Sequence, residues 1–306
     1  MSGEVGPTRQ VGAERGVTPA PPRRRQRRHT PYLLLAPAVL FMAAFFVWPM
    51  VQAFGLAFQT SAGTFTTANF SRMSSDLNFW PSIRNTLLLI AVLVPLQVAL
   101  ALAMALLLNS GIRWQSFWLY CWAIPLAISD LAAGIVWLAV FTDRGYLNSL
   151  LDTVGLAGFS WLSYENPVSL FMAVVIAETW RATAIVMVIL VAGLQVIPKE
   201  YGEAAQVFGA TGWQRLRHVT LPLLRPSLQV ALILRTILAF QVFAVVIALA
   251  GRNMPVLAGE AYYWYSSYSN PNVAAAYALV IMAFSLANTA IYLRALRTRD
   301  EEVGVR

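Results

Sequence analysis

Six long apolar stretches, separated by short polar segments, limit what this chain can fold into. They cover residues 32–58, 85–108, 116–141, 169–196, 227–250 and 273–296. A helix of about 20 apolar residues crosses the hydrocarbon core of a bilayer, and in lipid its backbone finds no partners outside the helix. Only 12% of the residues are charged, against about 25% in soluble domains. The pattern predicts an all-α integral membrane protein with six transmembrane helices.

Four prolines lie inside these stretches, namely Pro37, Pro49, Pro95 and Pro125. Within a membrane, neighbouring helices can satisfy the backbone group that a proline leaves unpaired. We therefore predict that the helices are kinked at these positions and remain continuous.

The basic residues are distributed unevenly between the two sides of the predicted membrane domain. When the N-terminus is placed in the cytoplasm, most of the 22 Lys and Arg residues fall in cytoplasmic segments. The opposite side then holds Arg72, Arg84, Arg144 and Arg252. Because Lys and Arg are retained on the cytoplasmic side, both termini are predicted to be cytoplasmic.

Polar segments stand at both ends of the chain. Residues 1–31 are rich in Pro, Gly, Gln and Arg, contain the basic run 23–28, and include no apolar run around which to fold. We expect a disordered cytoplasmic tail there, a membrane domain over 32–296, and a second cytoplasmic tail over 297–306. A basic run beside a first span typically anchors its orientation against anionic lipid. We therefore expect contact with the lipid bilayer and no nucleic-acid binding.

The polar segment 197–226 is the longest one on the cytoplasmic side. Pro198 suits the start of a helix, and Glu200 and Glu203 complement the positive end of its dipole. Ala205 and Gly209 stand four residues apart and share a face that another protein's helix or cleft can approach closely. Two interpretations remain open from the residues alone: a docking surface, or an amphipathic connector in the headgroup layer.

A turn and a second short helix are expected to follow. Gly209 and Gly212 permit a sharp turn, and residues 213–218 then form the second helix. Pro222 and Pro226 are expected to limit its continuation toward the next span. The predicted unit is helix, turn, helix.

A resemblance to a known family separates the two interpretations of this segment. Residues 203–205 (Glu-Ala-Ala), Gly209 and residues 219–222 (Val-Thr-Leu-Pro) resemble the EAA loop of binding-protein-dependent ABC importer permeases. The similarity covers nearly all of the chain after residue 31 and is greatest to carbohydrate permeases of the maltose and glycerol-phosphate type. Further matching segments are 34–37 with 48–49, 85–86 with 105–109, and 192–198. The glycine-rich segment after the fifth span is reduced here to 250–255, and an acidic residue is missing near 240–243.

The resemblance implies a type I ABC importer permease fold in a bacterial cytoplasmic membrane, with its permease domain over 32–296. It implies a second permease subunit, two copies of an ABC ATPase and an extracytoplasmic solute-binding protein as partners, and a sugar or related polar solute as cargo. Residues 197–226 would then form the loop that couples to the ATPase. The coupling residues would be Glu203, Ala204, Ala205, Gly209, Gly212, Leu221 and Pro222.

The energy for transport is expected to come from another chain. A P-loop needs Gly directly before its phosphate-binding Lys, but the only lysine is Lys199, and it follows Pro198. No metalloprotease or serine-hydrolase spacing is present, and a lone Cys121 allows no thiol-rich metal cluster. We therefore expect a transport subunit rather than an enzyme, with no cofactor or metal of its own. ATP and Mg²⁺ would serve the partner ATPase.

Ionisable residues inside the spans are candidates for a polar solute pathway, because charges in the membrane interior are costly. Glu178 and Arg181 lie three residues apart near mid-membrane, where they either neutralise each other or line a cavity. Arg235 and Asp130 either face a cavity or partner one another. Trp180, which either stacks on a sugar ring or packs, and Asn85 complete the candidates. In an ion-coupled secondary transporter, the alternative class, Glu178 and Asp130 would carry the coupling ion.

The aromatic run 262–265 is expected at the outer interface. It would form either part of an aromatic belt or a re-entrant segment near the pathway.

Overall fold

The computed structural model describes residue 3 and residues 30–295. The C-terminal tail predicted over 297–306 lies outside the described residues, and so does the N-terminal tail predicted over 1–31, apart from residues 3, 30 and 31. The chain divides after Met50 into two units. Nearly all of the described elements belong to the second.

The first unit is helical from Thr30 onward. Helix α1 (Thr30–Met42) runs into a π-helical turn, η1 (Ala43–Val47), and α2 (Trp48–Ala57) continues from it into the second unit. Pro37 lies inside α1, and Pro49 follows the wider turn. Together these elements form one apolar helix over Tyr32–Ala57, long enough to cross a membrane.

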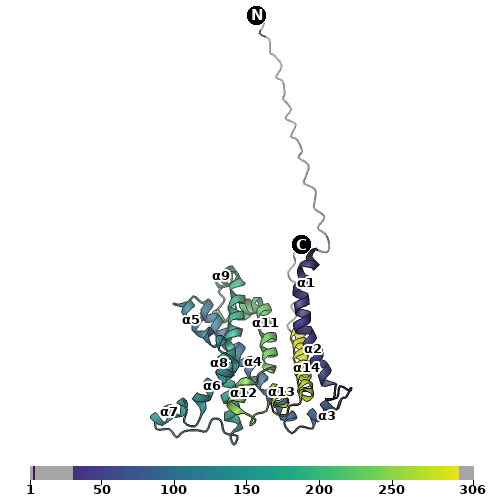
Figure 1. The fold of residues 1–306 in the computed structure, drawn as a ribbon. Helices are drawn as coiled ribbons and strands as arrows, with labels where there is room; N and C mark the ends of the chain where they lie inside the picture. The colour runs from purple at the N-terminus through teal and green to yellow at the C-terminus, as the bar shows by residue number, and fades with distance from the viewer. Residues whose placement is uncertain (1–2, 4–29, 296–306) are drawn as a thin grey trace. The chain divides into compact units, whose positions relative to one another are not determined.

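The second unit is a bundle of long helices with shorter helices at their ends (Figure 1). Its elements are α3 (Ala68–Ser74), α4 (Phe79–Asn109), α5 (Gln115–Ala123), η2 (Ile124–Ala127), α6 (Asp130–Phe141), α7 (Tyr146–Thr153), α8 (Pro167–Val196), α9 (Lys199–Val207), α10 (Gly212–Arg215), η3 (Leu216–Thr220), α11 (Leu221–Phe240), α12 (Ala244–Ala250), α13 (Leu257–Ser266) and α14 (Pro271–Ala295). In the described chain, five helices are long and apolar enough to span a membrane, and a bent pair makes a sixth crossing if counted as one.

Helices α4, α8 and α11 pack against one another and form the centre of the second unit. Small residues permit their close approach. A Cβ atom on Gly193 of α8 would collide with Ser227 of α11, and a Cβ on Gly134 of α6 would lie 2.6 Å from the Cβ of Ala248 in α12. In a membrane, where lipid is as apolar as the side chains, such contacts between small residues favour helix association.

Two apolar clusters lie along α4 and α8, one toward each end of the bundle. One gathers residues such as Leu93 and Val174, and the other gathers residues such as Leu108, Met187 and Leu190. Between them, along the same two helices, come buried polar and charged side chains. Along α4 and α8, the interior of the bundle therefore changes from apolar to polar and back to apolar.

The third span is not the continuous kinked helix predicted at Pro125. Helix α5 passes through the 3₁₀ turn η2, which contains Pro125, and ends before Ile128 and Ser129, both of which are extended. The chain then starts α6 at an angle of 100°. The Ser129 hydroxyl accepts a hydrogen bond from the Ala132 N–H at 3.2 Å, so Ser129 caps the new helix and Asp130 lies in its positive first turn.

The fifth span also differs from prediction at both of its ends. It ends at Phe240, and residues 241–243 separate it from α12, so the stretch 227–250 is not one helix. Its start lies earlier than predicted, because Gly212–Phe240 is one continuous helix through Pro222. The π-helical turn η3 ends at Thr220, two residues before Pro222, and such a wide turn accommodates a residue that lacks an N–H.

Candidate functional site

The segment 197–226 contains a helix, a tight turn and a second helix. Helix α9 begins directly after Pro198 and ends at Val207, and Gly209 follows with φ +79°. The N–H of Ala210 donates to the Ala205 carbonyl at 2.9 Å, and the N–H of Gly209 donates to the Gln206 carbonyl at 2.8 Å. This pair of bonds is a Schellman motif, which needs a left-handed residue at the position of Gly209.

The second helix has its own cap and a link back to the first. The Gln214 N–H donates to the Thr211 hydroxyl at 3.4 Å, and the Thr211 N–H donates to the Gln214 side-chain oxygen at 2.7 Å. These reciprocal bonds are a capping box. The Gln206 amide is oriented so that its oxygen and its nitrogen both face suitable partners. In this orientation its oxygen accepts a hydrogen bond from the Arg215 guanidinium. The turn is therefore fixed from both sides.

The surface of this loop is rich in exposed apolar side chains. Val207 is 86% exposed, Phe208 90% and Trp213 67%. Ala204 and Gly209 are also exposed, whereas Ala205 is half-buried. Among the other predicted coupling residues, Gly212 is the first residue of α10, and Leu221 and Pro222 are half-buried where α11 begins. The loop thus presents a small-residue surface with large apolar side chains at its tip.

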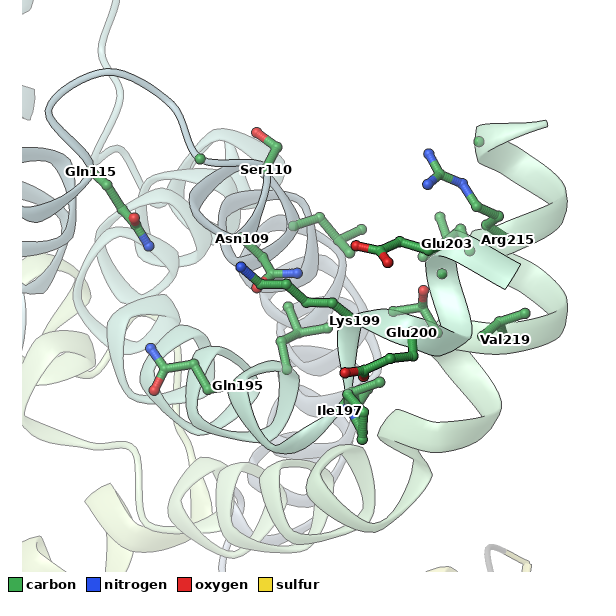
Figure 2. A pocket seen from close by; sticks show the side chains of 18 residues that line it. Asn109, Ser110, Gln115, Gln195, Ile197, Lys199, Glu200, Glu203, Arg215 and Val219 are labelled. Carbon is green, nitrogen blue, oxygen red and sulfur yellow. The ribbon is translucent and has the colours of Figure 1, made fainter. Parts of the chain in front are cut away.

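A cleft of about 960 Å³, lined by both polar and apolar side chains, lies between α9 and the ends of α4 and α8. Figure 2 shows Lys199, Glu200 and Glu203 directed from α9 into this cleft, with Asn109 at the end of α4 on the facing wall. Both carboxylates and the ammonium group are exposed. Glu203, the acidic residue of the predicted motif, is therefore accessible from the end of the bundle that carries this loop.

Four ionisable side chains meet inside the bundle, in the layer between the two apolar clusters. The Arg181 guanidinium lies 2.9 Å from a carboxylate oxygen of Glu178 and 2.8 Å from one of Asp130. Arg235 of α11 lies 3.1 Å from Glu178. Asp130 and Arg235 therefore do not pair directly, but are connected through Glu178 and Arg181. All four were predicted from the sequence as pathway candidates, and in the structure ion pairs connect them in one network.

Gln97 of α4 belongs to the same network and was missed from the sequence. It is fully buried; its amide nitrogen donates to the Glu178 carbonyl at 3.0 Å, and its amide oxygen accepts from Nε of Arg235. A lone amide in the middle of an apolar stretch was the available signal, because buried polar side chains require partners. We call Gln97, Asp130, Glu178, Arg181 and Arg235 the polar layer.

Solvent exposure rises along the polar layer from α11 toward the break in the third span. The side chains of Glu178 and Arg235 are 0% and 1% exposed, Arg181 is 17% exposed, and Asp130 is 50% exposed. Two cations and two anions balance, as buried charges require. The layer is therefore closed at one end and accessible at the other.

Comparison with known proteins identifies the family. The family model described as "Binding-protein-dependent transport system inner membrane component" matches residues 97–297, which include the loop and the whole polar layer. The chain belongs to this family. It is a multi-pass membrane permease, a transport subunit of an ABC importer rather than an enzyme.

Several characterised permeases resemble this one along most of its length. The sulfoquinovosyl glycerol transport system permease protein SmoG of Agrobacterium fabrum is 32% identical over 88% of this chain and 90% of the relative. The trehalose/maltose transport system permease protein MalF of Thermococcus litoralis is 31% identical over 88% and 94%. The sn-glycerol-3-phosphate transport system permease protein UgpA of Brucella abortus is 32% identical over 88% and 95%.

Solved structures share the fold. A bacterial ABC transporter involved in the import of the acidic polysaccharide alginate matches with a TM-score of 0.74 at 20% identity, covering 88% of this permease and 95% of that chain. The alginate transporter in complex with an alginate pentasaccharide-bound periplasmic protein matches with a TM-score of 0.72 at 22% identity, covering 87% and 93%. The permease therefore has the fold of an ABC importer membrane subunit.

Two predicted pathway residues of the permease lie outside the polar layer. Trp180 is 37% exposed and packs edge-on against Trp137, with ring centroids 6.0 Å apart. The Asn85 side chain donates to the Pro255 carbonyl at 2.9 Å and so connects α4 to the segment before α13. Neither side chain is connected to the four ionisable groups by a hydrogen bond or ion pair in the described chain.

A second ion pair, not identified from the sequence, fixes the segment around α13. Arg252 lies 3.3 Å from the buried Glu260, donates to the Tyr268 hydroxyl at 2.6 Å, and has its guanidinium carbon 4.8 Å from the ring centre of Tyr263. The hydrogen bond to Tyr268 raises the pKa of Arg252. Burial raises the pKa of Glu260, although Arg252 opposes the shift.

The aromatic run 262–265 in α13 does not face one environment. Tyr262 and Tyr265 are exposed, whereas Tyr263 and Trp264 are half-buried. The Trp264 indole N–H donates to Asp76 at 2.8 Å. Half of the run is therefore used to hold α13 in place, so it is not a uniform aromatic belt.

Proposed function

We propose that this permease imports a sugar or related polar solute, as one half of a membrane channel completed by a second permease subunit. Two ABC ATPase subunits would supply the energy, and an extracytoplasmic solute-binding protein would deliver the solute. The observation that carries the proposal is the capped helix–turn–helix with Glu203 accessible on its surface, in a chain whose relatives are named as permeases for sugars and polar glycerol derivatives. Both termini and the loop would face the cytoplasm.

The loop is proposed to be the docking site for the ATPase. Its exposed apolar tip, Val207, Phe208 and Trp213, would be unfavourable in water and is suited to burial against another protein. Glu203 adds a charge beside this tip, and the Schellman motif and capping box hold the shape that a partner groove would meet. The resemblance assigns the contact to Glu203 and Gly209, with Ala204, Ala205, Gly212, Leu221 and Pro222 as the rest of the motif.

The continuous helix Gly212–Phe240 supports a route for force from the loop to the membrane interior. Arg235 lies 23 residues beyond Gly212, or about 35 Å at the helical rise of 1.5 Å per residue. A displacement of the loop would therefore reach the polar layer without crossing a flexible joint. We propose that the accessible end of this layer, Arg181 and Asp130, contacts the solute.

The docking proposal can be tested through Lys199, because it is the only lysine in the chain. An amine-reactive acylating reagent then marks only Lys199 and the N-terminal amine, which mass spectrometry of the separated peptides distinguishes. We expect the ATPase to protect Lys199, which is exposed at the start of α9, and to leave labelling of the N-terminal amine unchanged. Equal labelling of Lys199 with and without the ATPase would contradict docking at this loop.

The transport proposal is tested by uptake into proteoliposomes that contain the complete complex. Accumulation of a labelled disaccharide should require internal ATP and the binding protein, and should continue when a protonophore and a sodium ionophore collapse ion gradients. Uptake that follows the ion gradient without ATP would instead support a secondary transporter. A series of neutral sugars, sugar acids and polyols in the same assay would identify the solute class.

A further inference from the structure

The segment between α6 and α8, residues 142–166, presents apolar side chains outward although it lies outside the long helices. Tyr146, Leu150 and Val154 are 68%, 48% and 70% exposed. They are spaced by four residues, so they follow one face of α7 and its C-terminal end. Leu156 and Phe159, further along, are 57% and 43% exposed. The segment therefore carries five exposed apolar side chains, three of them on one face of α7.

On the opposite side of α7, one buried amide connects the helix to the rest of the same segment. Asn148 is 2% exposed, and its nitrogen donates to the carbonyl of Phe159 at 2.9 Å and to that of Asp143 at 3.1 Å. Its oxygen accepts from the N–H of Phe159 and from the indole N–H of Trp161, both at 3.1 Å. Because the Asn148 side of α7 is buried, the helix cannot turn about its own axis. The apolar face with Tyr146, Leu150 and Val154 therefore points outward.

The position of α7 favours lipid as the occupant of that apolar face. The segment joins α6 to α8, a helix that spans the membrane, and so it lies where a membrane-crossing chain leaves the bilayer. In Figure 1, α7 projects sideways from the bundle formed by α4, α8 and α11. Tyr146 belongs to a residue type enriched at the membrane–water interface, and Ser149 and Asp152 of the same helix are exposed and polar. This division is that of an interfacial helix.

We propose that α7 lies in the headgroup layer of the outer leaflet, with Tyr146, Leu150 and Val154 directed toward the acyl chains. The assignment to the outer leaflet rests on the orientation in the proposed function, whereas the contact with lipid does not. The helix would fix the end of α6 opposite Asp130. It would thereby hold the half-exposed end of the polar layer at a constant depth in the membrane.

Spin labels on α7 test this proposal in the assembled complex reconstituted in phospholipid vesicles. Cys121 is first replaced by alanine, and single cysteines are then placed at Leu150 and, as matched control, at Asp152. We expect the label at 150 to be relaxed more by oxygen than by a water-soluble nickel chelate, at a depth of about 5–10 Å below the headgroup boundary. The label at 152 should show the reverse preference.

Two results with the label at 150 would overturn the proposal. Relaxation by nickel equal to that at 152 would mean that water covers the face, and protection from both reagents would mean that a protein subunit covers it. If nickel reaches the label at 152 only from the cytoplasmic side, the orientation in the proposed function is wrong while the contact with lipid stands.

A second pair of variants keeps the test independent of Cys121. In the natural background, Leu150→Asp should lower the yield of folded permease in membranes, because a carboxylate would enter the lipid boundary. Ser149→Asp, one residue away on the polar face, should leave the yield unchanged. Equal yields of the two variants would contradict lipid contact at Leu150.

Discussion

At the scale of single residues, Gly209 is constrained by its backbone and not by its neighbours. Its φ is +79°, and a Cβ placed on it would meet no atom within 4 Å. The structure shows open space around position 209 and a left-handed backbone, so a larger side chain there would be strained by the backbone conformation and not by contact with its neighbours. The left-handed conformation costs a non-glycine residue about 1–2 kcal/mol.

We therefore predict that Gly209→Ala lowers transport per ATP hydrolysed, because an alanine at this left-handed position would strain the Schellman turn that follows α9. Gly202→Ala is the matched control, since Gly202 is inside α9 and its Cβ would also meet nothing within 4 Å, but its φ is not positive. The measurement is uptake and ATP hydrolysis in the same proteoliposomes. Equal coupling ratios in the two variants would contradict the role of the turn.

Glu178 holds both arginines of the polar layer, so its charge should be the most costly to remove. In Glu178→Gln, Arg235 would remain buried without its carboxylate, and breaking a buried pair costs about 3–5 kcal/mol. Asp130→Asn removes the half-exposed carboxylate instead and should cost about 1 kcal/mol or less. Thermal unfolding in detergent measures both variants. A larger loss for Asp130→Asn would show that the buried pair is not the centre of the network.

At the scale of helices, the long elements were predictable and their interruptions were not. Six apolar stretches identified the spans, because length and hydrophobicity suffice for a membrane helix. Hydrophobicity carries no information about direction, so the 100° turn at Ile128 and Ser129 was invisible to it. The residue pair Ser129-Asp130, a good helix cap inside an apolar stretch, was the local signal for a new helix start.

The candidate site shows the same division between chemical type and geometry. Asp130, Glu178, Arg181 and Arg235 stood out because charge is rare in spans, but no spacing in the sequence could reveal that α6, α8 and α11 bring them together. Gln97 was missed because an uncharged amide is less conspicuous than a charge. Trp180 and Asn85 were named for their residue type; in the structure Trp180 packs against Trp137, and Asn85 holds the segment before α13.

The contact between α8 and α11 depends on Gly193. A Cβ there would collide with Ser227 and lie 2.9 Å from Leu224, so Gly193→Ala should separate the helices and destabilise the bundle by about 1–3 kcal/mol. Ser227→Gly in the same chain should restore part of the loss by removing the facing side chain. Thermal unfolding of the single and double variants measures this. A Gly193→Ala permease as stable as the natural chain would contradict the close approach.

At the scale of the whole molecule, the proposed coupling to an ATPase subunit requires a stiff connection from the loop over 197–226 to the membrane interior. The helix over Gly212–Phe240 provides one: it begins in the capped loop, passes Pro222 without a break, and carries Arg235 into the polar layer. The least regular part of this connection is the π-helical turn η3, where Arg217 and His218 are exposed. A loss of stiffness there should separate ATP hydrolysis from transport.

We predict that Arg217→Gly with His218→Gly reduces uptake per ATP hydrolysed, because each glycine weakens the helix by about 1 kcal/mol relative to alanine. Arg217→Ala with His218→Ala removes the same side chains but keeps the helix, so it should retain more coupling. Because both pairs lack the same charges, a difference between them reports the backbone alone. If the two pairs of variants transport equally well per ATP, force does not travel along this helix. The loop would then act on the bundle through α8, the helix before the loop in the chain.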